Sequence, residues 1–158
     1  MLAIIPLTMV SLAMAQPVSI DGQFDDWPQR PSEQPWELSV RSDQDSIYVL
    51  VHHHGPPRVA QQLEEPMKIG LDLDDNPETG CPQGELAGSE LAFILSPREP
   101  DQRRGGVIAV SWSDDGQKSY QSPYEHQFLL APSTASRRHE IRIARSSLGP
   151  MQPRVGLL

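Results

Sequence analysis

The chain has 158 residues, enough for one domain with a hydrophobic core and short for two. Its 13 Lys and Arg stand against 21 Asp and Glu, which gives a net charge of -8. Phosphate contacts need clustered basic side chains, so this acidic balance argues against a nucleic-acid partner.

The first 15 residues carry no charged side chain and end in the small-x-small pattern Ala13-Met14-Ala15. The run is shorter than the about 20 apolar residues that span a bilayer, and its end is typical of a signal-peptidase site. We therefore predict a secretion signal over residues 1–15 and a secreted or periplasmic domain over residues 16–158. No membrane span is expected after cleavage. The alternative interpretation is a buried N-terminal strand.

Short β-type runs separated by turn residues follow along the chain. Residues 17–20 form the first candidate strand, and residues 36–40 alternate apolar and polar side chains as a half-buried strand does. The turn at 43–45 leads into a run at 46–51 that is rich in β-formers. Further strands are expected over residues 67–73, 91–95, 107–112, 125–130 and 140–144. The only helical candidate, residues 59–65, lies between Pro57 and Pro66.

About eight strands at these intervals, with 16 Pro and 11 Gly spread along the chain, predict an all-β fold. We expect a two-sheet antiparallel β-sandwich, jelly-roll-like, with Trp27 buried at one end. The last residues, 154–158, resemble the opening of another strand, so we expect a C-terminally truncated sandwich from a longer protein. The predicted core consists of Ile47, Val49, Val51, Ile69, Leu71, Phe93, Leu95, Ile108, Val110, Ile141 and Ile143.

The most specific motif is the run from Ile20 to Trp27, which reads Ile-Asp-Gly-Gln-Phe-Asp-Asp-Trp. It resembles the opening of the family 9 carbohydrate-binding modules, which belong with related sugar- and heme-binding sandwiches to the DOMON-like superfamily. Further similar segments follow in the family's order at residues 47–49, 70–80, 88–90 and 140–149. The resemblance implies a non-catalytic module that binds a polysaccharide or oligosaccharide. It also implies a covalently linked catalytic domain, such as a hydrolase.

An acidic loop follows the predicted strand at residues 67–73. Asp72, Asp74 and Asn76 offer oxygen atoms at alternate positions, which is the ligand type and spacing that calcium requires, and Glu78 and Glu90 can add carboxylates. The resemblance also implies calcium, which family members often carry. The alternative is a solvated Asx-turn, in which the Asp and Asn side chains accept hydrogen bonds from their own backbone.

Sugar binding calls for exposed aromatic rings that stack on pyranose rings, with polar neighbours for the hydroxyls. Trp27 is assigned to the structural core. The candidates are Trp36, which follows a proline, Trp112, at a strand end beside two aspartates, and Tyr120 and Tyr124, in a polar-aromatic loop. For each of them the alternative is a structural place in the core or at an edge.

Three consecutive histidines, His52 to His54, follow a predicted strand. Successive side chains on a strand point to opposite faces, so only His52 and His54 can share a side. Two imidazoles can join a metal site, but the sequence shows no third ligand. The related heme-binding sandwiches imply an alternative function, an electron-transfer heme module. Met67 with one of these histidines is the only candidate axial pair for it.

The sequence contains no Gly-x-Ser-x-Gly, no phosphate-binding glycine loop and no His-Glu-x-x-His. Its adjacent carboxylate pairs lie at turns, whereas a glycosidase needs two carboxylates facing each other across a cleft. The lone Cys81 lies in a polar loop without a neighbouring base, so we interpret it as an incidental thiol. We expect no enzyme activity from this chain alone. Besides sugar binding, the remaining hypothesis is a structural sandwich that positions a catalytic domain and binds no ligand.

Overall fold

The computed structural model describes residues 17–28, 35–55, 59–99, 102–103, 105–149 and 154–157. The predicted secretion signal at 1–15 lies outside the described residues. The described part contains short strands and three single turns of 3-10 helix. The strands are β1 Trp36–Ser42, β2 Ser46–His53, β3 Met67–Asp72, β4 Leu91–Leu95, β5 Arg98–Glu99, β6 Gln102–Arg103, β7 Val107–Trp112, β8 Lys118–Gln121, β9 Leu129–Ala131, β10 Arg138–Ala144 and β11 Arg154–Leu157. The 3-10 turns are η1 Ala60–Gln62, η2 Pro123–His126 and η3 Arg145–Ser147.

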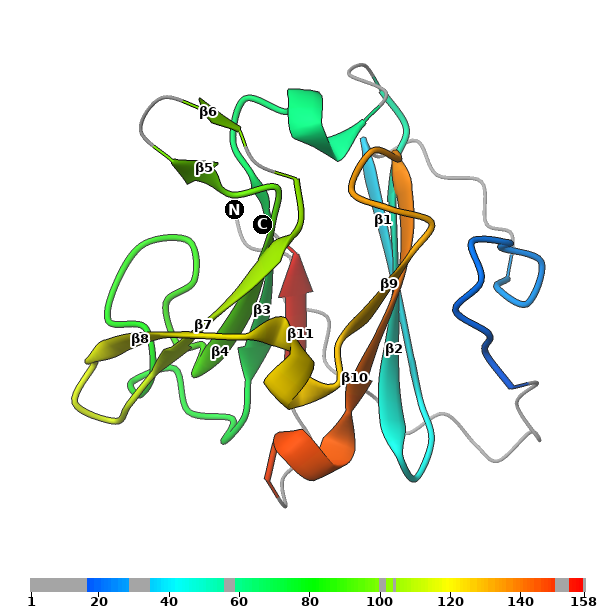
Figure 1. Cartoon of the computed structure of the whole chain (residues 1–158). Coiled ribbons are helices and arrows are strands. Elements are labelled where there is room, and N and C mark those ends of the chain that lie inside the picture. Colours follow the sequence, from blue (N-terminus) through cyan, green and yellow to red (C-terminus); the bar gives the residue numbers. More distant parts are fainter. Residues whose placement is uncertain are drawn as a thin grey trace.

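Two antiparallel sheets lie face to face (Figure 1). The four-stranded sheet has the order β1-β2-β10-β9, and the five-stranded sheet has the order β11-β3-β4-β7-β8. Strands β5 and β6 form a separate small hairpin. The predicted all-β, two-sheet antiparallel sandwich is therefore confirmed. None of the helices in the described ranges has the length and apolar character needed to cross a bilayer.

The main hydrophobic core lies between the two sheets. Side chains alternate along each strand, so every second residue of β2, β3, β4 and β10 points into this space. Phe93 of β4 is fully buried and its ring stacks on Phe128, with ring centroids 4.5 Å apart. The prediction is confirmed for the nine core residues contributed by these strands, Ile47, Val49, Val51, Ile69, Leu71, Phe93, Leu95, Ile141 and Ile143.

Two residues of the predicted core lie elsewhere. Ile108 and Val110 belong to a second apolar cluster, together with Ala92 and Trp112. These residues alternate with the inward-facing ones on β4 and β7, so the cluster lies on the outer face of the five-stranded sheet. Val110 is fully buried there, so its assignment to the core is confirmed, whereas Ile108 is only partly buried. A strand that is apolar on both faces gives no periodic signal to show which side of the sheet each residue faces.

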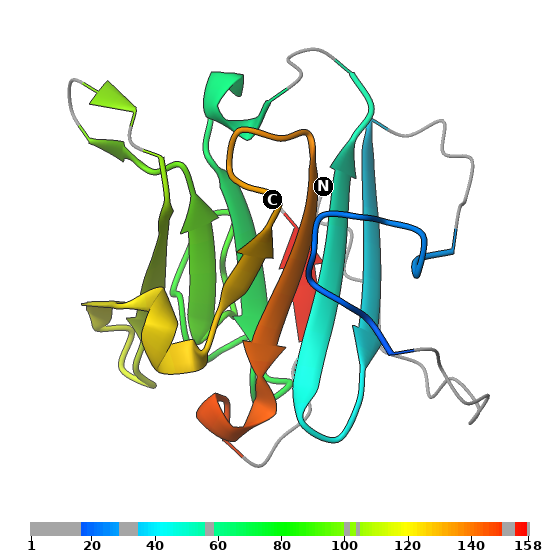
Figure 2. The same ribbon diagram turned by 45° about the vertical axis from the view of Figure 1, so that its right-hand side comes forward.

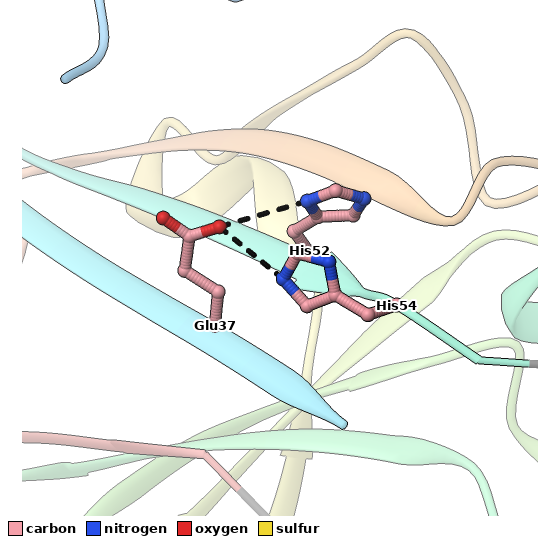
Figure 3. Close-up of side chains that lie close together, drawn as sticks. All are labelled: Glu37, His52 and His54. Carbon is pink, nitrogen blue, oxygen red and sulfur yellow. Dashed lines mark ion pairs between the residues drawn. The ribbon is translucent and has the colours of Figure 1, made fainter. Parts of the chain in front are cut away.

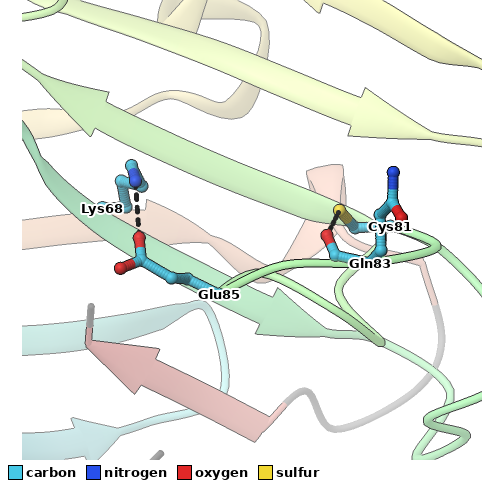
Figure 4. A network of polar contacts seen from close by, with 4 residues as sticks. All are labelled: Lys68, Cys81, Gln83 and Glu85. Carbon is cyan, nitrogen blue, oxygen red and sulfur yellow. Dashed lines mark hydrogen bonds and ion pairs between the residues drawn. The ribbon is translucent and has the colours of Figure 1, made fainter.

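A loop covers this outer face and completes the second cluster. It follows β3 and brings Cys81 and Leu86 onto the sheet, and Lys68 Nζ forms an ion pair with Glu85 Oε2 at 2.6 Å (Figure 4). The loop lies so close that a Cβ on Gly70 would stand 2.7 Å from Ser89 Oγ. Glycine at this position therefore permits the close approach of loop and strand.

The segment that contains the motif at residues 20–27, drawn in blue, crosses the outer face of the four-stranded sheet (Figures 1 and 2). Trp27 is 2% exposed, so its burial is confirmed. Its indole binds Glu140, which alternates with the inward-facing Ile141 of β10, so Trp27 covers the sheet from outside. The expected place at one end of the core is wrong. The predicted strand at 17–20 is also wrong, because this segment forms no strand.

The expected strand at 125–130 is replaced by η2 followed by the shorter β9. The expected helical segment at 59–65 contains only the single turn η1. The sequence analysis places Tyr120 in a loop, because the residues around it are polar. In the structure these residues form the edge strand β8 and are mostly exposed. The strand-like segment near the C-terminus forms β11, which pairs with β3.

Candidate functional site

The acidic loop brings together three of the predicted ligands, the carboxylates of Asp72, Asp74 and Glu90. Asp72 ends β3, Asp74 lies two residues further, and Glu90 directly precedes β4. One carboxylate oxygen from each of the three lies within 4.8 Å of the others. Thr79 donates its hydroxyl to Asp74 and to Glu90, at 2.9 and 3.1 Å. The arrangement offers oxygen ligands of the kind that hard cations such as calcium prefer.

The same loop also makes the Asx-turn contacts of the alternative interpretation. Asp72 Oδ1 accepts the backbone N–H of Asp75 at 2.7 Å, and Asp74 Oδ1 accepts that of Asn76 at 2.9 Å. Asn76 Oδ1 accepts the N–H of Glu78 at 3.1 Å. The two interpretations are compatible, because a carboxylate oxygen that accepts one hydrogen bond has a second lone pair for a cation.

Glu90 holds the two ends of this loop against each other. Its Oε2 accepts the backbone N–H of Leu73 at 2.7 Å, and its own N–H donates to the carbonyl of Leu71 at 3.1 Å. Gly80 has φ +70°, and a Cβ there would lie 2.5 Å from Glu90 Oε1. A glycine is thus required at the point where the loop turns back over Glu90.

The four aromatic candidates for sugar contact separate into buried and exposed pairs. Trp112 is 9% exposed beneath the loop, and Trp36 is partly buried with its ring centroid 4.4 Å from that of His53. Tyr120 is 67% exposed and Tyr124 is 82% exposed. Only the two tyrosines therefore present open ring faces of the size that stacking on a sugar requires.

Near η2 the structure has an open depression of about 550 Å³ that the sequence did not indicate. Three polar side chains line it: Gln127, which follows η2, Arg142 of β10 and Arg145 of η3. The opposite wall comes from the start of β2. Segments about 80 to 100 residues apart in the sequence form it together, so no local motif could have revealed it. Its lining can donate hydrogen bonds to hydroxyl or carboxylate oxygens.

The histidines at the end of β2 divide between the two faces of the four-stranded sheet. His53 points inward and packs on Trp36, whereas His52 and His54 lie on the outer face. Glu37 of β1 pairs with His52 across the strands. Its Oε2 lies 3.6 Å from His52 Nδ1 and 3.4 Å from His54 Nε2 (Figure 3). The third polar partner that the sequence did not show is thus Glu37.

Burial lowers the pKa of His52 below its usual value, and the neighbouring His54 and Arg138 lower it further, against the opposing effect of Glu37. The imidazole is therefore held toward its neutral form. Met67 points into the main core and is 2% exposed, on the other side of the four-stranded sheet from His52 and His54. That separation does not favour Met67 with His52 or His54 as an axial pair for heme. His53 points inward as Met67 does, and its ring packs on Trp36.

No protein-family model matches the chain, and comparisons with curated proteins and with solved structures find no match either.

Proposed function

We propose that the chain is a non-catalytic module of an exported protein that binds a glycan through Tyr120 and Tyr124. The observation that carries the proposal is the exposure of these two rings, at 67% and 82%. They come from β8, an edge strand, and from η2, which follows it directly. Exposed tyrosines combine an apolar face for a pyranose ring with a hydroxyl that hydrogen-bonds sugar hydroxyls.

Local contacts support both tyrosines in their exposed positions. Lys118 Nζ lies 4.8 Å from the centroid of the Tyr120 ring. Tyr124 lies in a turn closed by a capping box, in which Ser122 Oγ accepts the N–H of Tyr124 and Glu125 accepts the N–H of Ser122. A turn fixed in this way reduces the conformational entropy lost when a ligand binds.

Polar groups for sugar hydroxyls lie close to η2 in the sequence and in the fold. Gln127 donates its backbone N–H to the carbonyl of Tyr124 at 3.0 Å and lines the open depression. Arg142 and Arg145 line it as well. The depression is open to solvent, and Tyr120 and Tyr124 are not among the residues that line it. The resemblance of residues 20–27 to family 9 carbohydrate-binding modules supports the same ligand class.

We further propose that a calcium ion binds Asp72, Asp74 and Glu90 and has a structural role. The convergence of these three carboxylates at the two ends of one loop supports this proposal. A cation there would relieve their mutual repulsion and hold the loop over Trp112.

Retention of the purified protein on insoluble cellulose, xylan and chitin tests the glycan proposal. We expect retention on at least one of them, and a loss of affinity of about tenfold for Tyr120→Ala or Tyr124→Ala. Leu129→Ala is the matched control, because Leu129 is 43% exposed but lies on the four-stranded sheet. The proposal is wrong if no polysaccharide retains the protein or if the tyrosine variants bind as well as the control.

The burial of Trp36 and Trp112 favours a second candidate function, a structural sandwich that positions a neighbouring catalytic domain. With these two rings buried or partly buried, few aromatic rings are left to contact a ligand. This candidate predicts that the tyrosine substitutions change neither retention nor folding.

A further inference from the structure

We propose that Glu37, His52 and His54 form a binding site for a divalent transition-metal ion of the zinc type, separate from the acidic loop. The ligand atoms are one carboxylate oxygen and one nitrogen from each imidazole, and all three lie within 4.8 Å of one another. Figure 3 shows both imidazoles turned toward the same carboxylate.

The β1–β2 hairpin places Glu37 and His52 side by side, and His54 directly follows β2, where its backbone N–H donates to the carbonyl of Pro35 at 2.9 Å. Glu37 and His52 are direct partners in the antiparallel register, and His54 lies two residues after His52. Residues two apart on an extended chain project to the same side. Paired strands are a more rigid support for a metal site than a loop, because neighbouring hydrogen bonds fix the backbone.

The distances suit a shared ion better than direct hydrogen bonds. Glu37 Oε2 lies 3.6 Å from His52 Nδ1 and 3.4 Å from His54 Nε2. Hydrogen bonds between nitrogen and oxygen are usually about 2.7–3.2 Å long. Zinc binds nitrogen and carboxylate oxygen at about 2.0–2.2 Å with tetrahedral geometry, which sets its ligand atoms roughly 3.4 Å apart. The two separations between Glu37 and the imidazoles are therefore close to those between ligand atoms of a tetrahedral ion.

The site can be reached from solvent, and its donors define the class of ion. The exposed fractions of the side chains are 11% for Glu37, 17% for His52 and 28% for His54. Two imidazoles with one carboxylate favour zinc and its neighbours over calcium and magnesium, which prefer all-oxygen ligands. Three protein ligands leave a fourth position for water or for another ligand.

The charges around the site are mixed. Arg138 of β10 is the direct partner of His52 on the other side of β2, and Arg137 precedes it. The Arg138 guanidinium carbon lies 4.3 Å from the centroid of the Phe24 ring. Both cations oppose the binding of a metal ion, whereas the Glu37 carboxylate and the net charge of -8 favour it.

Calorimetric titration of the chelator-treated full chain with ZnCl₂ tests the proposal. Calcium at millimolar concentration is kept present, so that the acidic loop does not compete for zinc. We expect one zinc ion per chain, and a loss of affinity of more than about tenfold in each of His52→Ala, His54→Ala and Glu37→Gln. Cobalt in place of zinc should give the visible absorption of a low-symmetry site in the wild type only.

Matched controls separate this site from the rest of the chain. Glu65→Gln removes one exposed carboxylate outside the site and should retain zinc binding. Asp74→Asn should also retain it, and Cys81→Ser excludes a contribution of the thiol. Melting curves in chelator show whether each variant folds, and the three ligand substitutions provide independent tests. Absence of zinc binding by the wild type, or equal zinc affinity in the folded ligand variants, would overturn the proposal.

Discussion

Trp27 donates its indole Nε1–H to Glu140 Oε1 over 2.9 Å, although 113 residues separate the two in the sequence. Glu140 Oε2 accepts the backbone N–H of Gly22 at 2.9 Å, so one buried carboxylate binds the N-terminal segment at two points. Glu140 is fully buried and Trp27 is 2% exposed. The opening motif is therefore part of the folded domain through this pair.

Replacing Glu140 by Ala should destabilise the protein by about 3 kcal/mol, because two donors then lose their acceptor in a buried place. Urea unfolding followed by Trp fluorescence measures the change. Glu140→Gln keeps the size of the side chain but offers only one acceptor oxygen, so its loss should be smaller. A change below about 0.5 kcal/mol in both variants would show that the N-terminal segment is not held by Glu140.

The same carboxylate should make stability depend on pH. Burial raises the pKa of Glu140 above its usual 4.5, although hydrogen bonds from Gly22 and Trp27 act in the opposite direction. Above pH 4.5 the folded state then binds more protons than the unfolded chain. The contribution of Glu140 to the free energy of unfolding therefore falls as the pH rises through the pKa of Glu140 in the folded state. In Glu140→Gln this decrease should be absent, which stability curves from pH 4 to 8 can show.

His139 should give the opposite dependence on pH. It is 1% exposed, and burial lowers its pKa from 6.5 to about 4. Between these values the unfolded chain binds more protons, so stability is complete above about pH 6.5 and falls as the pH drops toward 4. The loss over that range is about 3 kcal/mol. His139→Gln should flatten the slope, and an unchanged slope would contradict the prediction.

Phe93 should be among the most sensitive positions of the core. Its ring is fully buried, stacks on Phe128 and meets the edge of His126, with centroids 5.5 Å apart. Phe93→Ala should lower the free energy of unfolding by about 3–5 kcal/mol, from lost burial and the cavity left behind. Tyr120→Ala, at an exposed ring, should change it by less than about 0.5 kcal/mol. Equal effects of the two substitutions would contradict the core assignment.

Calcium should raise the melting temperature if it binds the acidic loop as proposed. An ion that binds only the folded state at about 100 times its dissociation constant stabilises it by about 2.7 kcal/mol. Melting curves in millimolar calcium and in chelator should differ by several degrees, and Asp74→Ala should abolish the difference. Identical curves for the wild type would leave only the Asx-turn interpretation of this loop.

The sequence predicted most of the strands that have one buried face or two. Strands β4 and β7 match the expected bounds because apolar runs ended by turn residues are unambiguous. Strand β8 was missed because an exposed edge strand lacks the apolar face on which periodicity depends. The second apolar cluster around Val110 could not be predicted for a different reason: a covering loop, which the pattern of β7 does not reveal, buries the outer side of the sheet.

The candidate sites differ in whether their residues are neighbours in the sequence or are brought together only by strand pairing. The acidic loop could be predicted because its aspartates are neighbours in the sequence. Glu90 was named as a further carboxylate, and it directly precedes strand β4. Glu37 was missed as a partner of His52 because the pairing depends on the register across the turn at residues 43–45. That register sets residues whose numbers sum to 89 opposite each other, as 37 and 52 do, so knowledge of the turn geometry alone would have indicated it.

The loop between β3 and β4 is held at its own two ends, where Glu90 accepts the N–H of Leu73. Cys81 of this loop packs with Trp112 on the outer face of one sheet, and each of the two is 9% exposed. Such a segment can open without unfolding of the domain between the sheets. The rate at which an alkylating reagent modifies Cys81 under native conditions would therefore report the opening of this loop alone. The Cys81 thiol can thus be used to measure the local stability of the loop that holds the acidic residues.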